Sequence, residues 1–147
     1  MPASDNAVGT NAVTVFVVDD DCLLRELICS RVRVHGFRVI EAATGDQALP
    51  VLQAASLDVL VTDISMPGAI DGWVLGERAR LMRPEIVVIY VSSGPADAAR
   101  QVSHSLYLQK PFHPDAVVAA IRHLTSQCTG GGGGDEGNGE CEGDPPS

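Results

Sequence analysis

The sequence has 147 residues, of which 45% are hydrophobic and 20% are charged, as is usual for one globular domain. Its formal net charge of −9 argues against non-specific nucleic-acid binding, because no basic patch offsets the repulsion of phosphates. No apolar stretch reaches the roughly 18 residues that a membrane span needs, and the N-terminus lacks the pattern of a signal peptide. The 4 cysteines form no CxxC pair, and Cys22 and Cys29 are predicted to be small core residues of one helix. These features predict a cytoplasmic protein.

Short β-branched runs alternate with segments of helical periodicity along residues 13–127. We predict five strands, at 13–18, 37–42, 57–63, 85–94 and 105–111. Five helices are predicted at 21–36, 44–55, 71–84, 95–104 and 113–127.

Single residues indicate where two of these helices begin. Asp20 or Asp21 is a candidate N-cap of the first helix, and Thr44 is a candidate N-cap of the second. Pro50 lies inside the second helix and is expected to kink it or to shift its start.

The two ends of the chain lack this periodicity. Residues 1–12 are predicted to be a flexible N-terminus, residues 13–127 one domain, and residues 128–147 a disordered Gly-rich acidic tail. No Lys or Arg follows Arg122, so the tail carries much of the negative charge and the folded part is only mildly acidic.

Strands that alternate with helices predict an α/β fold, in which a five-stranded parallel sheet has helices on both faces and so forms three layers. In open sheets of this kind, ligands bind beyond the carboxyl ends of the strands. Charged and hydroxyl side chains stand at four of the predicted strand ends: Asp19, Asp20 and Asp21; Asp63; Ser92; and Lys110.

Three adjacent carboxylates repel one another, which is costly unless a cation lies among them. Mg²⁺ prefers oxygen ligands and is commonly held by one or two carboxylates together with phosphate oxygens. The composition of this sheet edge therefore predicts a magnesium site.

The motifs VVDDD, VLVTDISMPGAIDG, VIYVSSG and YLQKPF resemble, in order and spacing, those of the CheY-like receiver domains of two-component response regulators. The resemblance covers roughly residues 13–127. It implies a flavodoxin-like (βα)5 fold with the strand order 2-1-3-4-5. The loop at residues 68–72 is one residue longer than the commonest form of this family.

The resemblance also implies roles for single residues at this edge. Asp63 would be the phosphoacceptor, which takes a phosphoryl group from a histidine of a sensor histidine kinase or of a histidine phosphotransfer protein. Asp19, Asp20 and Asp63, with the backbone carbonyl of Ser65, would bind Mg²⁺. Asp21 is expected to cap the first helix instead.

Three further residues would bind the phosphoryl group or respond to it. Lys110 would bind the acceptor carboxylate and then a phosphoryl oxygen. Ser92 would move toward the phosphoryl group, and Tyr107 would turn inward in response. Ordinary packing remains an alternative for Tyr107, as does a plain strand-end hydroxyl for Ser92, and Trp73 is expected to pack beside the site or to half-cover it.

We therefore expect a single-domain response regulator that is not an enzyme in the usual sense. No DNA-binding or enzyme segment is recognisable after residue 127, so its output would be a contact with a downstream protein or a phosphorelay. The expected partners include neither nucleic acid nor membrane, and the expected state is a monomer or a weak dimer.

Three other functions stay open at this point. The first is an interaction module with the same fold that works without phosphorylation. The second is a hydrolase or phosphatase that uses Asp63 as its nucleophile, although Ser65 is a poor general acid. The third is a flavin carrier, although carboxylates stand where a phosphate-binding loop would be expected.

Overall fold

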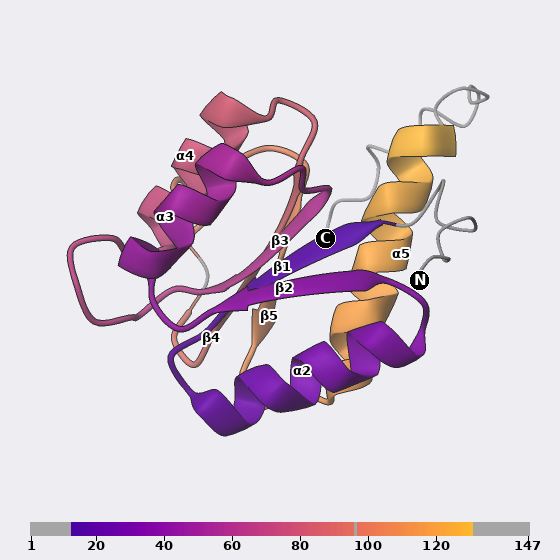
Figure 1. The fold of residues 1–147 in the computed structure, drawn as a ribbon, viewed down its shortest axis with the longest axis horizontal. Helices are drawn as coiled ribbons and strands as arrows, with labels where there is room; N and C mark the ends of the chain where they lie inside the picture. Colours follow the sequence, from indigo (N-terminus) through magenta and orange to yellow (C-terminus); the bar gives the residue numbers. More distant parts are fainter. Residues whose placement is uncertain (1–12, 96, 131–147) are drawn as a thin grey trace.

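A computed structural model describes residues 13–95 and 97–130 of the chain as one parallel sheet with helices on both faces (Figure 1). Its elements are β1 (Thr14–Val18), α2 (Cys22–Val34), β2 (Arg38–Ala42), α3 (Gly45–Ala54), β3 (Val59–Asp63), α4 (Gly72–Met82), β4 (Val87–Ser92), β5 (Ser105–Gln109) and α5 (Pro114–Gly130). The strands are hydrogen-bonded in the order β2-β1-β3-β4-β5, and all four pairings are parallel. The predicted α/β fold and strand order are therefore confirmed.

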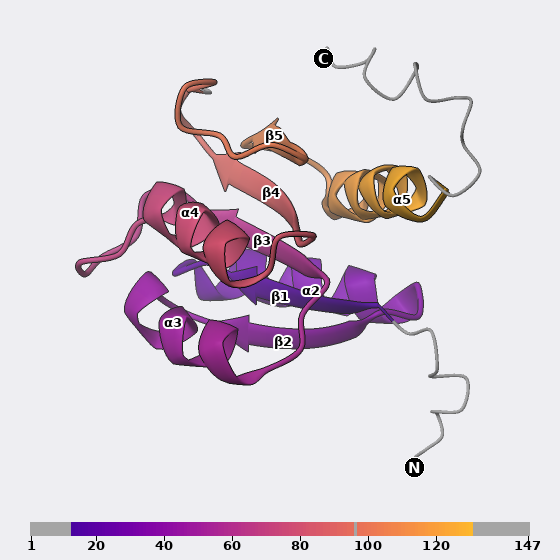
Figure 2. The same ribbon diagram turned by 90° about the horizontal axis from the view of Figure 1, so that it is seen from above.

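The helices form two layers that bury opposite faces of the sheet (Figure 2). Ile28 of α2 and Ile121 of α5 belong to one apolar cluster, together with alternate residues of the strands such as Val15. Leu52 of α3 and Leu75 of α4 belong to the other cluster, together with the strand residues that point to the opposite face, such as Phe16. Each such side chain contributes about 1.5–3 kcal/mol on burial, so packing on both faces fixes the direction in which every strand end points.

The helix predicted at residues 95–104 is wrong. In the described part of this connection, a turn follows Asp97, whose backbone oxygen accepts from the N–H groups of Arg100 and Gln101. The N–H of Val102 then donates to the hydroxyl of Tyr90 at 3.2 Å, which is a tertiary contact. The segment has too few large apolar residues to cover a helical face, so contacts to the core decide its path.

The predicted N-caps of α2 and α3 are confirmed. The carboxylate of Asp21 accepts from the N–H groups of Leu23 and Leu24 at 3.1 and 3.2 Å, and the hydroxyl of Thr44 caps α3. Helix α3 begins at this cap and continues past Pro50, so the expected shift of its start does not occur.

Two other details differ from expectation. Cys29 is buried as predicted, but Cys22 is exposed. Helix α5 continues to Gly130, beyond the predicted end at residue 127. Among the described residues, no helix combines the length and the apolar character that a membrane crossing requires. The predictions for residues 1–12 and 131–147 lie outside the described part of the chain.

Replacing Pro50 should stabilise the protein. Proline has no N–H to donate to the carbonyl of Asp46 one turn earlier, and Pro50 is an exposed residue inside α3. We expect Pro50→Ala to raise the free energy of unfolding by about 1–3 kcal/mol in urea titrations. An unchanged or lower value would show that the fixed backbone angle of proline matters more than the missing hydrogen bond.

Candidate functional site

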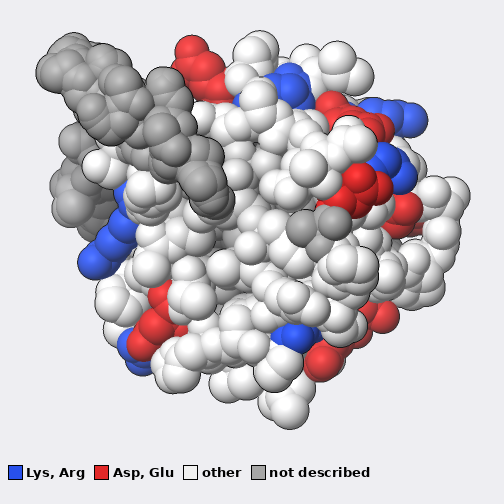
Figure 3. Space-filling view, turned by 180° about the vertical axis from the view of Figure 1, so that it is seen from behind, with Lys and Arg blue, Asp and Glu red and all other residues white. Residues whose placement is uncertain are grey.

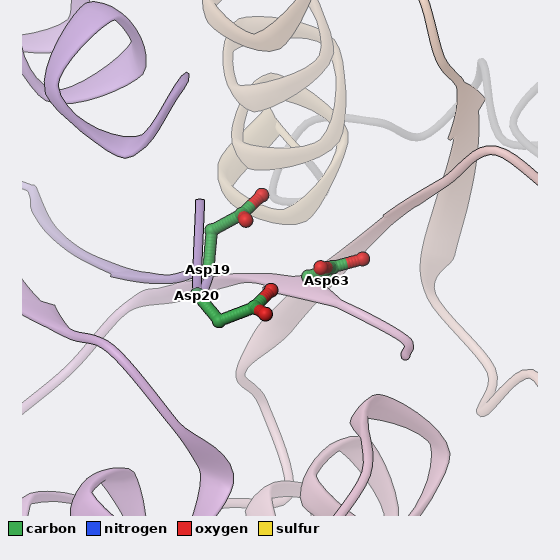
Figure 4. Close-up of side chains that lie close together, drawn as sticks. All are labelled: Asp19, Asp20 and Asp63. Carbon is green, nitrogen blue, oxygen red and sulfur yellow. The ribbon is translucent and has the colours of Figure 1, made fainter. Parts of the chain in front are cut away.

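Three carboxylates meet at the carboxyl ends of the central strands β1 and β3 (Figure 4). Val18 pairs with Thr62 in the sheet, so Asp19 follows one strand beside the place where Asp63 ends the other. Ligand oxygens of Asp19, Asp20 and Asp63 all lie within 4.8 Å of one another. Asp19 is 1% exposed and Asp63 is 5% exposed, whereas Asp20 is exposed, so solvent reaches the cluster from the Asp20 side.

One ammonium group is shared by the two buried carboxylates. The Nζ atom of Lys110 lies 3.5 Å from Oδ2 of Asp19 and 3.5 Å from Oδ1 of Asp63. The backbone N–H of Lys110 donates to the carbonyl of Ser92 at 2.7 Å, which fixes the position of Lys110 just beyond β5. The structure thus brings together four of the predicted site residues: Asp19, Asp20, Asp63 and Lys110.

The pKa values show that Lys110 does not balance the negative charge. Burial and, after it, the charge of Asp19 raise the pKa of Asp63 to about 7, although Lys110 acts against both. Burial also raises the pKa of Asp19, against the N–H of Asp21 and the charge of Lys110. A buried group whose pKa rises in this way resists ionisation, so the site favours any added positive charge.

Asp19 has one oxygen without a hydrogen bond. Its Oδ1 accepts from the N–H of Asp21 at 2.8 Å, but its buried Oδ2 accepts no hydrogen bond from the described residues. Buried polar atoms are almost always hydrogen-bonded, so this oxygen, which has the Lys110 ammonium at 3.5 Å and belongs to a group of three carboxylates, indicates a place for a further cation. Asp21 itself is outside this group, since its carboxylate caps α2.

Ser92 ends β4, the strand next to the one that carries Asp63, and Ser65 follows Asp63 by two residues. Ser92 is buried and follows Val91, the residue that pairs with Asp63, and its hydroxyl accepts from the N–H of Gly94 at 3.2 Å. Ser65 is exposed and lines a shallow depression together with Asp20. The role of the Ser65 carbonyl and the movement of Ser92 stay predictions.

Gly72 is a site residue that the sequence analysis missed. A Cβ atom added to Gly72 would lie 2.2 Å from the carbonyl oxygen of Asp63 and 2.6 Å from the Cα atom of Ile64. The N–H of Gly72 also donates to the carbonyl of Ile64 at 2.8 Å. Only glycine lets α4 start so close to the strand that carries Asp63. The Asp71–Gly72 pair in the sequence was the available sign of this close approach.

An aromatic cluster joins Tyr107 to α4 and to the connection between β4 and β5. The ring of Trp73 lies 6.5 Å from that of Tyr107 and 4.9 Å from that of Tyr90. The guanidinium carbon of Arg100 lies 5.7 Å from the centroid of the Trp73 ring. The hydroxyl of Tyr107 donates to the carbonyl of Gly94. Sequence reasoning missed these contacts of Arg100 because it assigned this residue to a helix.

Comparison with known proteins identifies the family. A profile described as "Response regulator receiver domain" matches residues 15–122. The "Probable transcriptional regulator ycf27" of Cyanophora paradoxa is 29% identical over 119 residues, which are 78% of this chain and 48% of that protein. More generally, the chain spans about a quarter to a half of the length of the curated relatives it matches.

Solved structures agree with this assignment. A response regulator receiver protein from Sinorhizobium medicae is 31% identical and has a TM-score of 0.75. The match covers 78% of this chain and 95% of the Sinorhizobium chain. The response regulator TrrA from Thermotoga maritima, solved in complex with Mg(2+)-BeF, is 23% identical and has a TM-score of 0.66. The match covers 76% of this chain and 98% of the TrrA chain, which has the same fold. With the carboxylate cluster at the sheet edge, these matches show that the chain belongs to the family of response regulator receiver domains.

Proposed function

We propose that this receiver domain takes a phosphoryl group from a phosphohistidine onto Asp63 and then signals through a changed protein contact. The observation that carries the proposal is the environment of Asp63. This buried carboxylate ends a central strand, lies 3.5 Å from the ammonium of Lys110, and stands beside two further carboxylates. Structural needs alone do not account for such a group, since an apolar residue would cost far less to bury.

The donor atoms of the site fit Mg²⁺. Carboxylate oxygens of Asp19, Asp20 and Asp63 lie close together, and one buried oxygen of Asp19 accepts no hydrogen bond from the described residues. The ion would be held by these three residues and by the backbone carbonyl of Ser65. When bound, it supplies positive charge that offsets the repulsion of the carboxylates and of the phosphoryl oxygens. The Mg(2+)-BeF complex of the related TrrA supports this choice of ion.

The residues of the chain would act on the phosphoryl group as follows. An oxygen of the Asp63 carboxylate forms a bond to phosphorus while the bond from phosphorus to the donor imidazole nitrogen breaks, and its electron pair stays on that nitrogen. Lys110 neutralises charge on the phosphoryl oxygens, and Ser92 adds a hydrogen bond. Asp63 must be ionised to attack, and Lys110 is one group that favours its ionised form.

The contacts of Tyr107 suggest how the signal would leave the site. Gly94 donates to the hydroxyl of Ser92 and accepts from the hydroxyl of Tyr107, so a movement of Ser92 would disturb both hydrogen bonds. Tyr107 in turn lies against Trp73, over which Arg100 is placed. We propose that this cluster passes the change to the surface beside β5.

The charge distribution suits a protein partner at that surface. The side of the molecule opposite to the view of Figure 1 carries its charged side chains mainly around the margin of a broad uncharged area (Figure 3). Such a surface favours contact with a protein over contact with phosphates. One relative is named a probable transcriptional regulator, so the absence of a nucleic-acid partner stays a prediction for this chain.

The alternatives fit the site less well. A module that works without phosphorylation has no use for crowded buried carboxylates, which destabilise the fold. A flavin phosphate would meet three negative charges. A hydrolase would need a general acid two residues after Asp63, where Ser65 stands. The single-domain arrangement, the non-enzymatic role, the monomeric or weakly dimeric state and the cytoplasmic location stay predictions.

Phosphorylation can be tested by intact mass spectrometry after incubation with a small-molecule phosphodonor. We expect one phosphoryl adduct on the wild type with Mg²⁺, and none without Mg²⁺ or on Asp63→Asn. Asp58→Asn is the matched control, because Asp58 is an exposed carboxylate at the opposite ends of the strands, and it should be modified like the wild type.

If no adduct forms, a Mg²⁺ titration monitored by Trp73 fluorescence shows whether the protein fails to bind the metal or fails only to accept the phosphoryl group. Trp73 is the 1 tryptophan of the sequence and lines the depression beside Asp20. Binding of Mg²⁺ without an adduct would indicate that the domain accepts a phosphoryl group only from its own protein donor and not from a small molecule. No adduct and no binding would overturn the proposal in favour of the phosphorylation-independent module.

The carboxylate crowding also predicts a pH-dependent stability of the metal-free protein. The pKa of Asp63 is about 7 in the folded protein and ordinarily 3.8, so the stability that its protonated form contributes is fully present below about pH 3.8 and is lost progressively as the pH rises to about 7. Asp63→Asn should therefore raise the free energy of unfolding by about 1–3 kcal/mol at pH 8 and by less at pH 5, where only part of the contribution has been lost. Urea titrations at both pH values measure the difference. A pH-independent effect of Asp63→Asn would contradict the prediction.

A further inference from the structure

The loop that follows the acceptor strand is fixed firmly at its base. Residues 64–71 join β3 to α4, and the N–H of Gly72 donates to the carbonyl of Ile64 at 2.8 Å, which closes the loop. Asp71 caps α4 by accepting from the N–H of Val74 at 2.9 Å. These bonds hold the two ends of the loop but not its tip at residues 67–70.

The tip of the loop lies against the first turn of α3. Oδ1 of Asp46 accepts a hydrogen bond from the N–H of Ile70 at 3.1 Å. Gly68 has a positive φ of 103°, and a Cβ atom there would lie 3.0 Å from Oδ2 of Asp46. A Cβ atom on Gly45 would lie 2.3 Å from the carbonyl oxygen of Ile70. Two glycines and one carboxylate thus form a contact with no room for a larger side chain.

Asp46 is not required to cap its own helix. The hydroxyl of Thr44 accepts from the N–H of Gln47 at 3.1 Å, and the side-chain oxygen of Gln47 accepts from the N–H of Ala43 at 3.1 Å. These two bonds resemble a capping box, except that Gln47 accepts from the residue before the N-cap, and the bond to Thr44 satisfies one exposed donor at the start of α3. The carboxylate of Asp46 is therefore available for the loop, and that is where its hydrogen bond goes.

We propose that Asp46 is a positioning residue for the phosphoacceptor site. By holding the tip of the loop, it fixes the path of the backbone from Asp63 through Ser65, whose carbonyl is the one metal ligand that a flexible loop would carry. The inference rests on the proposed function of this site. The extra residue in the loop makes such an anchor more valuable, because a longer loop loses more conformational entropy when it is ordered.

The test compares three substitutions in the full chain. Asp46→Ala removes the hydrogen bond and the charge, whereas Asp46→Asn keeps an oxygen that can accept from Ile70 and removes only the charge. Both lose the favourable charge at the start of α3, so the difference between them reports the hydrogen bond. Asp58→Ala is the control, since Asp58 is also exposed and accepts one backbone N–H, from Thr14 at 2.9 Å, far from the site.

Two readouts are independent of phosphorylation. Amide hydrogen exchange of Ile70, measured by NMR without metal, reports the anchor itself, and Mg²⁺ affinity from Trp73 fluorescence reports its effect on the site. We expect Asp46→Ala to speed the exchange and to weaken Mg²⁺ binding by about three- to tenfold. Asp46→Asn should stay within about twofold of the wild type, and Asp58→Ala should change neither readout.

The outcomes separate this inference from the proposed function. Wild-type affinity for Mg²⁺ in Asp46→Ala would overturn the positioning role alone. Equal losses in Asp46→Asn and Asp46→Ala would show that Asp46 acts by its charge and would also overturn it. A wild type that does not respond to Mg²⁺, with a normally protected Ile70 amide, would instead overturn the function proposed for the site.

Discussion

The burial of like charges at one strand end is the constraint on which the rest of this structure depends. Asp19 and Asp63 are almost fully buried, and a single ammonium, that of Lys110, lies 3.5 Å from each of them. One positive charge does not offset the desolvation of two carboxylates, and so the pKa of Asp63 rises to about 7. The unfavourable electrostatic energy of the fold is therefore concentrated at this carboxylate site, where an added positive charge would relieve it most.

The packing of the domain keeps that cost from being relieved by movement. Apolar clusters on both faces hold β1 and β3 in register, and α4 starts in contact with the backbone of Asp63 at Gly72. A rigid surround of this kind preorganises charges, because the side chains cannot turn into solvent. The buried carboxylates therefore destabilise the fold locally, and the same crowding makes the site respond strongly to a cation or a phosphoryl group.

The segments around the site are fixed by side chains rather than by regular structure. Asp46 holds the loop after β3, and Arg100 with Trp73 holds the connection between β4 and β5 against α4. Single hydrogen bonds and one cation–π contact are weak enough to be exchanged when the site changes its charge. The same segments therefore connect the interior of the site to the surface that a partner would meet.

The sequence alone determined the sheet, its helices on both faces and the convergence of Asp19, Asp20, Asp63 and Lys110, because apolar periodicity and parallel strands leave one edge for the strand ends. It did not predict the open connection at residues 95–104, the contact of Gly72 with Asp63 or the anchor at Asp46. Those features depend on residues far apart in the chain. Only the tertiary structure decides them, since a short polar segment takes its conformation from the surface on which it lies.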